Sequence, residues 1–260
     1  MLRIGTAASL EDLENMTKLN AGRPLMEDRA AELGEFLGVS EAEATSIFEK
    51  YNVSRTIRYA GFDPSTFTTI LESYTNRDTF LHDASRLMLH YTRLPMAFQL
   101  VSRFNTIFPN RNQRISVFDY GCGAADFALA FALHGYFVTL IDLEKGNLRL
   151  AEWRFQRRNL EHDVIAISEM QEYPEFKDAD IVLAGDLLEH LRDPREGITA
   201  VHRGLKPNGY FWFPDFPLKE KSVGGAHLES AAALRDESAE LVRTLFDGRL
   251  HKMKHLMRRR

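Results

Sequence analysis

The chain has 260 residues, 44% of them hydrophobic, and a formal net charge of −4. These values fit one large globular domain or a catalytic domain with an attached module, and they exclude the strongly basic balance of a general nucleic-acid-binding protein. The single cysteine excludes an intramolecular disulfide and fits a reducing compartment. We expect a cytoplasmic protein without a membrane partner, because the sequence has no secretory h-region and no apolar run of membrane-spanning length.

Residues 1–112 predict a separate helical domain, joined by a polar link at 109–114 to a second domain at 113–260. The expected helices are Ser9–Leu19, a segment from Pro24 to Gly38, one capped by Ser40, one at 63–74, one opening at Asp78 and one opening at Pro95. Aromatic residues are frequent between residues 51 and 108. They either fill the core of this domain or line a pocket, and Phe80, His90 and Tyr91 are the candidates for a pocket.

Residues 117–142 organise the rest of the chain. A buried strand at Ser116–Tyr120 leads through a glycine turn into an apolar helix at Asp126–His134, and a second buried strand ends at Asp142. Asp142 follows Gly121 by 21 residues, which is where a nucleotide-binding βαβ unit places a carboxylate for ribose hydroxyls. The pattern predicts an α/β fold with a doubly wound, mostly parallel sheet.

The glycine turn, GCGAAD at residues 121–126, distinguishes between nucleotides. A dinucleotide fingerprint has glycine at the last position, where this chain has Asp126, and Asp119 precedes the turn. Two carboxylates repel a pyrophosphate but attract a ligand that carries an ammonium and a sulfonium. The turn therefore favours a cationic nucleoside over NAD or ATP. Cys122 is interpreted as a small loop residue.

The motif Asp119-x-Gly121-x-Gly123-x-Ala125 resembles motif I of the class I S-adenosylmethionine (SAM)-dependent methyltransferases, with alanine at the family's third glycine. The resemblance continues through Asp142, through ADIVLAGDLLEHLRDP at 179–194 and through LKPNGYFWF at 205–213. It implies that SAM is the cofactor. The SAM-binding residues that it implies are Asp119, Tyr120, Gly121, Cys122, Gly123, Asp142, Leu143, Glu169, Met170 and Asp186. The alternative is an α/β domain without a cofactor.

After Asp142 the chain alternates helix and strand. We expect helices at 147–160 and 195–205 and strands at 163–168, 180–184 and 210–216, which bring polar residues to the carboxyl edge of the sheet. These residues are Gly121, Asp142, Glu169, Asp186 and Asp215. Family members often complete a seven-stranded sheet with a helix and a two-strand hairpin. Here a helix at 231–246 leaves only residues 249–260, so we expect a sheet that is short at its C-terminal edge, or a partner such as a second copy in a homodimer that covers it.

Candidate catalytic residues follow the fourth and fifth strands. A general base is needed only where the acceptor loses a proton, and Glu189, His190 and His227 are the candidates, with Asp215 as a secondary one. The alternative role of the Glu-His pair is to cap and pack the following helix. Asp186, Glu189, His190 and His227 also resemble the metal site of certain SAM-dependent O-methyltransferases. We expect no metal, because the histidine-rich segment of those enzymes is reduced here to AHLES at 226–230.

These observations combine into a SAM-dependent methyltransferase that acts on oxygen or nitrogen of a small-molecule acceptor, with the N-terminal helices closing the pocket. One alternative is other SAM chemistry on the same fold, such as aminocarboxypropyl transfer or SAM cyclisation, which releases methylthioadenosine. A second is a SAM-binding protein without turnover. The acidic charge balance makes RNA a less favoured substrate.

Overall fold

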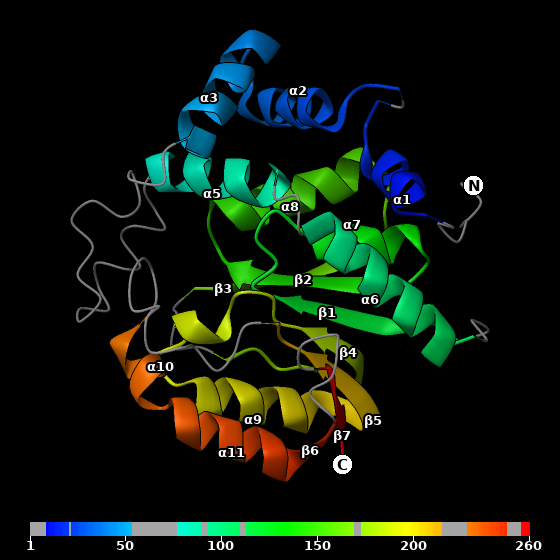
Figure 1. The fold of residues 1–260 in the computed structure, drawn as a ribbon, viewed down its shortest axis with the longest axis vertical. Coiled ribbons are helices and arrows are strands. Elements are labelled where there is room, and N and C mark those ends of the chain that lie inside the picture. Colours follow the sequence, from blue (N-terminus) through cyan, green and yellow to red (C-terminus); the bar gives the residue numbers. More distant parts are fainter. Residues whose placement is uncertain are drawn as a thin grey trace.

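The computed structural model describes residues 9–20, 22–53, 77–89, 93–109, 113–168, 173–214, 228–248 and 256–260. Within them a seven-stranded sheet has the order β3-β2-β1-β4-β5-β7-β6, and helices cover both of its faces (Figure 1). The strands are β1 (Ser116–Tyr120), β2 (Phe137–Leu143), β3 (His162–Ile167), β4 (Ala179–Leu183), β5 (Leu205–Trp212), β6 (Phe246–Asp247) and β7 (Leu256–Arg259). Strands β1 to β5 are parallel, and β7 runs antiparallel to both of its neighbours. The predicted α/β fold with a doubly wound, mostly parallel sheet is confirmed.

The helices of the described residues are α1 (Leu10–Thr17), α2 (Leu25–Leu37), α3 (Glu41–Val53), α5 (Arg77–Leu89), α6 (Arg93–Ile107), α7 (Asp126–Leu133), α8 (Gly146–Arg157), α9 (Pro194–Gly204), α10 (Glu229–Ala233) and α11 (Arg235–Leu245), with a 3-10 turn, η1 (Leu188–His190). Local signals position several of their ends. The Ser9 side chain accepts from the amide of Asp12 and caps α1, and Gly38, with φ of 69°, ends α2. Helix α6 begins before Pro95, at Arg93, and the helix expected at 63–74 lies outside the described residues.

Side chains alternate between the two faces of the sheet. Val117 of β1 and Val138 of β2 belong to a buried cluster with α6, α7 and α8. Phe118 of β1 and Val182 of β4 face the opposite way, into a cluster with α9 and α11. The carboxyl ends of the parallel strands therefore meet at one edge, between two helical layers (Figure 1).

The helices α2, α3 and α5 form a further layer above α8 (Figure 1). A third buried cluster joins Leu33 of α2, Phe48 of α3 and Met88 of α5 to Leu150 of α8 and to Ala124 of the glycine turn. The division of the chain at residue 112 stays a prediction. None of the helices among the described residues is long and apolar enough to span a membrane.

The C-terminal edge corrects an expectation from the sequence. The sheet is not short there: β7 lies between β5 and β6, and β6 consists of Phe246 and Asp247, the residues that follow α11. The sequence pattern assigns Phe246 to the end of a helix, and a two-residue strand carries no alternation that would reveal it. The helix expected at 231–246 is also two helices, α10 and α11.

Strand β5 begins at Leu205, five residues before the expected start at Tyr210. Its pairing with β4 shifts register, because Ala179 pairs with Leu205 whereas Ile181 pairs with Tyr210. The turn-prone segment Lys206-Pro207-Asn208-Gly209 is thus a bulge inside a strand rather than a separate turn.

Candidate cofactor site

The glycine turn between β1 and α7 folds against β2 and the loop after β4. The amides of Gly121 and Cys122 donate to the Ile141 carbonyl oxygen at 2.8 and 3.0 Å. Gly121 has a φ of 73°, and a Cβ atom there would lie 2.8 Å from Cδ1 of Leu187. The positive φ favours glycine at residue 121, and the Leu187 side chain packs closely against it.

Asp142 at the carboxyl end of β2 holds this turn from the side. Its Oδ2 accepts from the Gly123 amide at 2.8 Å, and its Oδ1 accepts from the Leu143 amide at 2.7 Å. Each carboxylate oxygen keeps a second lone pair, so Asp142 can also accept from ribose hydroxyls. Burial raises the pKa of Asp142 to about 6, in spite of these two hydrogen bonds and with a contribution from the negative charge of Asp83 on α5.

Asp119 lies in β1, directly beneath the turn, and is 1% exposed. One of its carboxylate oxygens accepts from the Ala128 amide in the first turn of α7 at 3.2 Å. Burial raises the pKa of Asp119 to about 7, against the opposing effect of the nearby Arg93 guanidinium. The site therefore holds two carboxyl groups, Asp119 and Asp142, that both ionise close to neutral pH.

Arg93, the first residue of α6, brings a buried cation to the same edge. Its Nη2 lies 2.6 Å from Oδ2 of Asp186 in the loop after β4, and its guanidinium stands 5.6 Å from the ring centre of Phe127. Asp186 is thus at the predicted edge, but its carboxylate is paired. Arg93 is not among the predicted site residues, because it precedes Asp186 by 93 residues. The one local signal for it is a charged residue among apolar ones at the start of a helix.

Helix α5 also covers this edge. Its Phe80 ring packs on Gly146, where a Cβ atom would lie 2.6 Å from Cδ2 of the ring, just beyond the end of β2. The negative charge of Asp83 on this helix contributes to the raised pKa of Asp142. Nδ1 of His82 lies 3.2 Å from Oδ1 of Asp83. Of the three aromatic pocket candidates, Phe80 therefore lies beside the site, while His90 and Tyr91 are outside the described residues.

The Glu-His pair forms η1, immediately after the β4 loop. Glu189 is 4% exposed and its carbonyl oxygen accepts from the Leu228 amide at 3.0 Å, whereas His190 is half-buried. His190 is therefore the more accessible of these two predicted catalytic residues. His227, like Glu169, Met170 and Asp215, lies outside the described residues. In the part of the chain that the structure describes, no three His, Cys, Asp or Glu side chains gather as a metal site would require.

The other candidates around the turn have different surroundings. The Tyr120 ring is buried against Phe176, with ring centres 5.4 Å apart, and Leu143 is half-buried at the end of β2. Burial raises the pKa of the Cys122 thiol well above its usual range.

Asp126 does not face the turn as an unpaired charge, because its Oδ1 lies 2.9 Å from Nη1 of Arg154. The two carboxylates that favour a cationic ligand at the turn are therefore Asp119 and Asp142, rather than the predicted pair of Asp119 and Asp126.

This arrangement fits SAM by the chemistry of its donors and acceptors. The Asp142 carboxylate offers hydrogen-bond acceptors at the end of β2. Gly121 and Gly123 have positive φ and no side chain, so a ligand can approach the backbone of the turn closely. The carboxyl groups of Asp119 and Asp142 attract a sulfonium when they are ionised.

Residues 118–213 match the family described as a methyltransferase domain. With the sheet order and the glycine turn, this match supports a class I SAM-dependent methyltransferase domain at residues 118–213. The cofactor of that class is SAM, as the sequence motifs predict.

The chain resembles curated relatives named ubiquinone biosynthesis O-methyltransferase. The one from Pseudomonas syringae pv. tomato is 35% identical over 100 residues, which cover 37% of this chain and 42% of the relative. The one from Rickettsia akari is 23% identical over 146 residues, 55% of each chain. The chain thus spans about half the length of the curated relatives it matches.

Solved structures with a similar arrangement include a SAM-dependent methyltransferase from Clostridium acetobutylicum, with a TM-score of 0.42, 17% identity, and coverage of 52% of this chain and 56% of that one. Another is the plantazolicin methyltransferase BpumL in complex with a desmethyl analogue and SAH, with a TM-score of 0.48, 15% identity and coverage of 76% of both chains.

Proposed function

We propose that the protein transfers the methyl group of SAM to a small-molecule acceptor, at oxygen or nitrogen. The observation that carries this proposal is the contact of Asp142 with the glycine turn, in which a carboxylate at the end of β2 is fixed by the Gly123 amide 2.8 Å away. The match of residues 118–213 to a methyltransferase domain supports it. A hydroxyl acceptor is the finer proposal, supported by the O-methyltransferase names of the curated relatives.

Bound SAM supplies an electrophilic methyl group on a sulfonium, so the chain has mainly to orient the cofactor and the acceptor. Asp142 would accept hydrogen bonds from the ribose hydroxyls, and the turn from Gly121 to Gly123 would hold the cofactor. Asp119, beneath the turn, would add negative charge that favours a sulfonium. His190 is the proposed general base where the acceptor is a hydroxyl, because a methylated oxygen must lose its proton.

The helices that precede β1 take part in this proposal. Phe80 and Asp83 on α5 and Arg93 on α6 lie at the carboxyl edge of the sheet. Their position supports a pocket that is closed by the N-terminal helices, in accordance with the predicted domain at 1–112. The cytoplasmic location and the homodimer stay predictions from the sequence.

The test is to incubate the protein with candidate metabolite extracts and SAM labelled at the methyl group, and to identify both products. S-Adenosylhomocysteine together with a labelled acceptor supports methyl transfer. Methylthioadenosine would establish the other SAM chemistry instead. Tight SAM binding without turnover on any extract would favour a binding protein and count against the proposal.

A further inference from the structure

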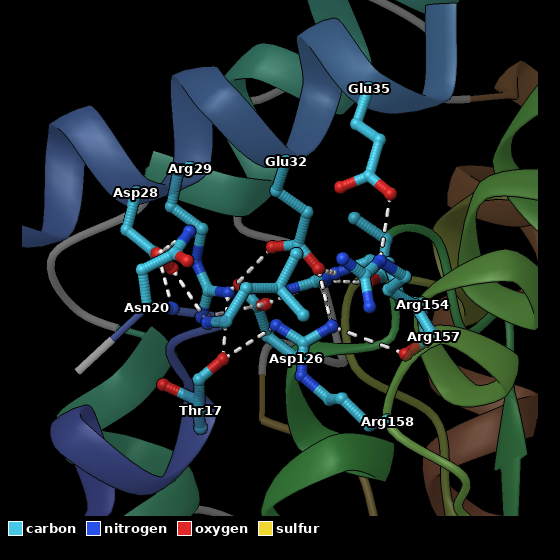
Figure 2. Close-up of polar contacts among 12 residues, drawn as sticks. Thr17, Asn20, Asp28, Arg29, Glu32, Glu35, Asp126, Arg154, Arg157 and Arg158 are labelled. Atoms are coloured by element: carbon cyan, nitrogen blue, oxygen red, sulfur yellow. Dashed lines mark hydrogen bonds and ion pairs between the residues drawn. The ribbon is translucent and has the colours of Figure 1, made fainter.

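The N-terminal helices contact the cofactor turn through a buried network of charged side chains (Figure 2). Glu32 of α2 is fully buried, and its two oxygens accept from three arginines. The Nε of Arg154 on α8 donates to Oε1 of Glu32 at 3.0 Å, and Nη1 of Arg29 donates to Oε2 at 2.8 Å. Arg158 donates to Oε1 as well. Glu32 therefore fixes one edge of the Arg154 guanidinium.

The other edge of the Arg154 guanidinium holds the turn itself. Its Nη1 donates to the carbonyl oxygen of Ala124 and, at 2.9 Å, to Oδ1 of Asp126. Ala124 lies between Gly123, with φ of 54°, and Ala125, with φ of 62°. A left-handed conformation at the non-glycine Ala125 is unfavourable by itself, so surrounding contacts must maintain it. Arg154 supplies two such contacts from a planar and rigid group.

The charges of this network persist over the whole physiological pH range. Burial alone would raise the pKa of Glu32, but Arg154, Arg29 and Arg158 together hold it well below its usual range. Burial likewise disfavours the charged form of Arg154, yet Glu32 and Asp126 raise its pKa. The contact between α2, α8 and the turn is therefore ionic at neutral pH.

From this geometry we propose that Glu32 and Arg154 are positioning residues for SAM binding. Glu32, on a helix that precedes the sheet domain, orients Arg154, and Arg154 holds the peptide after Ala124 and the start of α7 in the conformation that receives the cofactor. The inference rests on the proposed function, because it assigns the ligand of the turn. It adds that SAM affinity depends on α2, which lies on the far side of α8 from the sheet (Figure 1).

Two neighbouring contacts provide matched controls. Arg158 shares Glu32 with Arg154, but its Nη1 and Nη2 also donate to the carbonyl oxygens of Arg154 and Thr17, and neither donates to the turn. Glu35, one turn along α2, pairs with Arg157 of α8 at 2.7 Å, and both side chains are about half exposed. Arg158→Lys therefore disturbs the same buried network, and Glu35→Gln breaks an ion pair between the same two helices, without removing a contact to the turn.

The experiment compares Arg154→Lys and Glu32→Gln with Arg158→Lys and Glu35→Gln in the full chain. Lysine keeps the charge but cannot bond Glu32, Ala124 and Asp126 together, so Arg154→Lys isolates the geometry of the guanidinium. The measurements are SAM affinity by calorimetry, the thermal midpoint, and hydrogen exchange of the amides of residues 123–126 without ligand. We expect Arg154→Lys and Glu32→Gln to weaken SAM binding roughly ten-fold, the scale of one hydrogen bond to a charged group, and to speed exchange in the turn.

The controls should keep wild-type affinity and exchange in the turn, even where Arg158→Lys lowers the thermal midpoint. Equal affinity and equal exchange in Arg154→Lys and Arg158→Lys would overturn the inference, as would losses that follow the thermal midpoint in all four variants. Absence of SAM binding to the wild-type protein would refute the proposed function instead. Exchange in the turn would then still decide whether Arg154 holds it.

Discussion

At the scale of single residues, Asp142 is the side chain on which cofactor binding depends most directly. Asp142→Ala removes the acceptor for ribose hydroxyls and also the partner of the Gly123 amide. We expect SAM binding to weaken by roughly 1.5–3 kcal/mol, or about ten-fold to a hundred-fold, as for a lost hydrogen bond to a charged group. Calorimetry measures the loss, and a far-UV spectrum like that of the wild type shows that the fold remains. Unchanged affinity would contradict the assigned site.

The carboxyl groups of Asp119 and Asp142 give the site a predictable pH dependence. Their pKa values, about 7 and about 6, lie above those of free carboxyl groups, mainly because of burial. They therefore stabilise the fold most at low pH, and this contribution is lost as the pH rises through 6 to 7. Binding of a sulfonium needs the ionised forms, so SAM affinity should rise between pH 5 and 8.

Titration calorimetry over this range measures the effect, with Asp142→Asn as the comparison. That variant should bind weakly and lose the part of the pH dependence that comes from residue 142. Because the two carboxyl groups interact, the wild-type profile will report the pair rather than either group alone. An affinity for SAM that is flat across this range would show that neither group faces the cofactor.

At the scale of elements, the close packing of α9 against the segment before β4 leaves no space for a side chain at Gly204. Gly204, the last residue of α9, lies so near the segment before β4 that a Cβ atom would stand 1.9 Å from the carbonyl oxygen of Phe176. Gly204→Ala must therefore displace backbone, and we expect a loss of about 1–3 kcal/mol in the free energy of unfolding. Urea denaturation measures it. Thr199→Ala, at an exposed position in the same helix, should change stability far less; similar losses in both variants would contradict the packing argument.

The elements also show what the sequence reveals and what it does not. The first strand, the glycine turn and α7 are predictable because their signals are local: apolar runs, glycines that allow positive φ, and a carboxylate at a fixed separation. The two-residue β6 has no such signal, and its absence from the prediction led to the wrong expectation of a short sheet. Arg93 with Asp186, and Glu32 with Arg154, are tertiary contacts across about a third and nearly half of the chain, respectively. No pattern of residue spacing encodes them.

At the scale of the whole molecule, the network around Glu32 joins the helices before β1 to the sheet domain. The pKa of Glu32 lies below its value in the unfolded chain, so its contribution to stability is present above about pH 4.3 and is lost as the pH falls further. Glu32→Gln leaves three arginines with one fewer counter-charge, and we expect a loss of roughly 3–5 kcal/mol in the free energy of unfolding at neutral pH.

This loss should shrink as the pH falls below 4, because the Glu32 carboxylate is then protonated in the unfolded wild-type chain while the arginines keep it ionised in the folded protein. Denaturant titrations of both proteins from pH 3 to 7 measure the difference, and Glu35→Gln provides the comparison for a solvent-exposed pair. A difference between Glu32→Gln and wild type that stays constant to pH 3 would mean that Glu32 acts through packing and not through its charge.

The placement of β7 has a consequence for the order in which the sheet is completed. Strand β6 precedes β7 in the chain, yet its sheet neighbour is β7, which lies between it and β5. The chain thus forms the outermost strand, β6, before β7, the strand that separates it from β5. Phe246 and Asp247 can form strand hydrogen bonds only after Leu256–Arg259 have paired with β5. Deleting these four residues should therefore remove both β6 and β7 from the sheet and leave the five parallel strands, β1 to β5, intact.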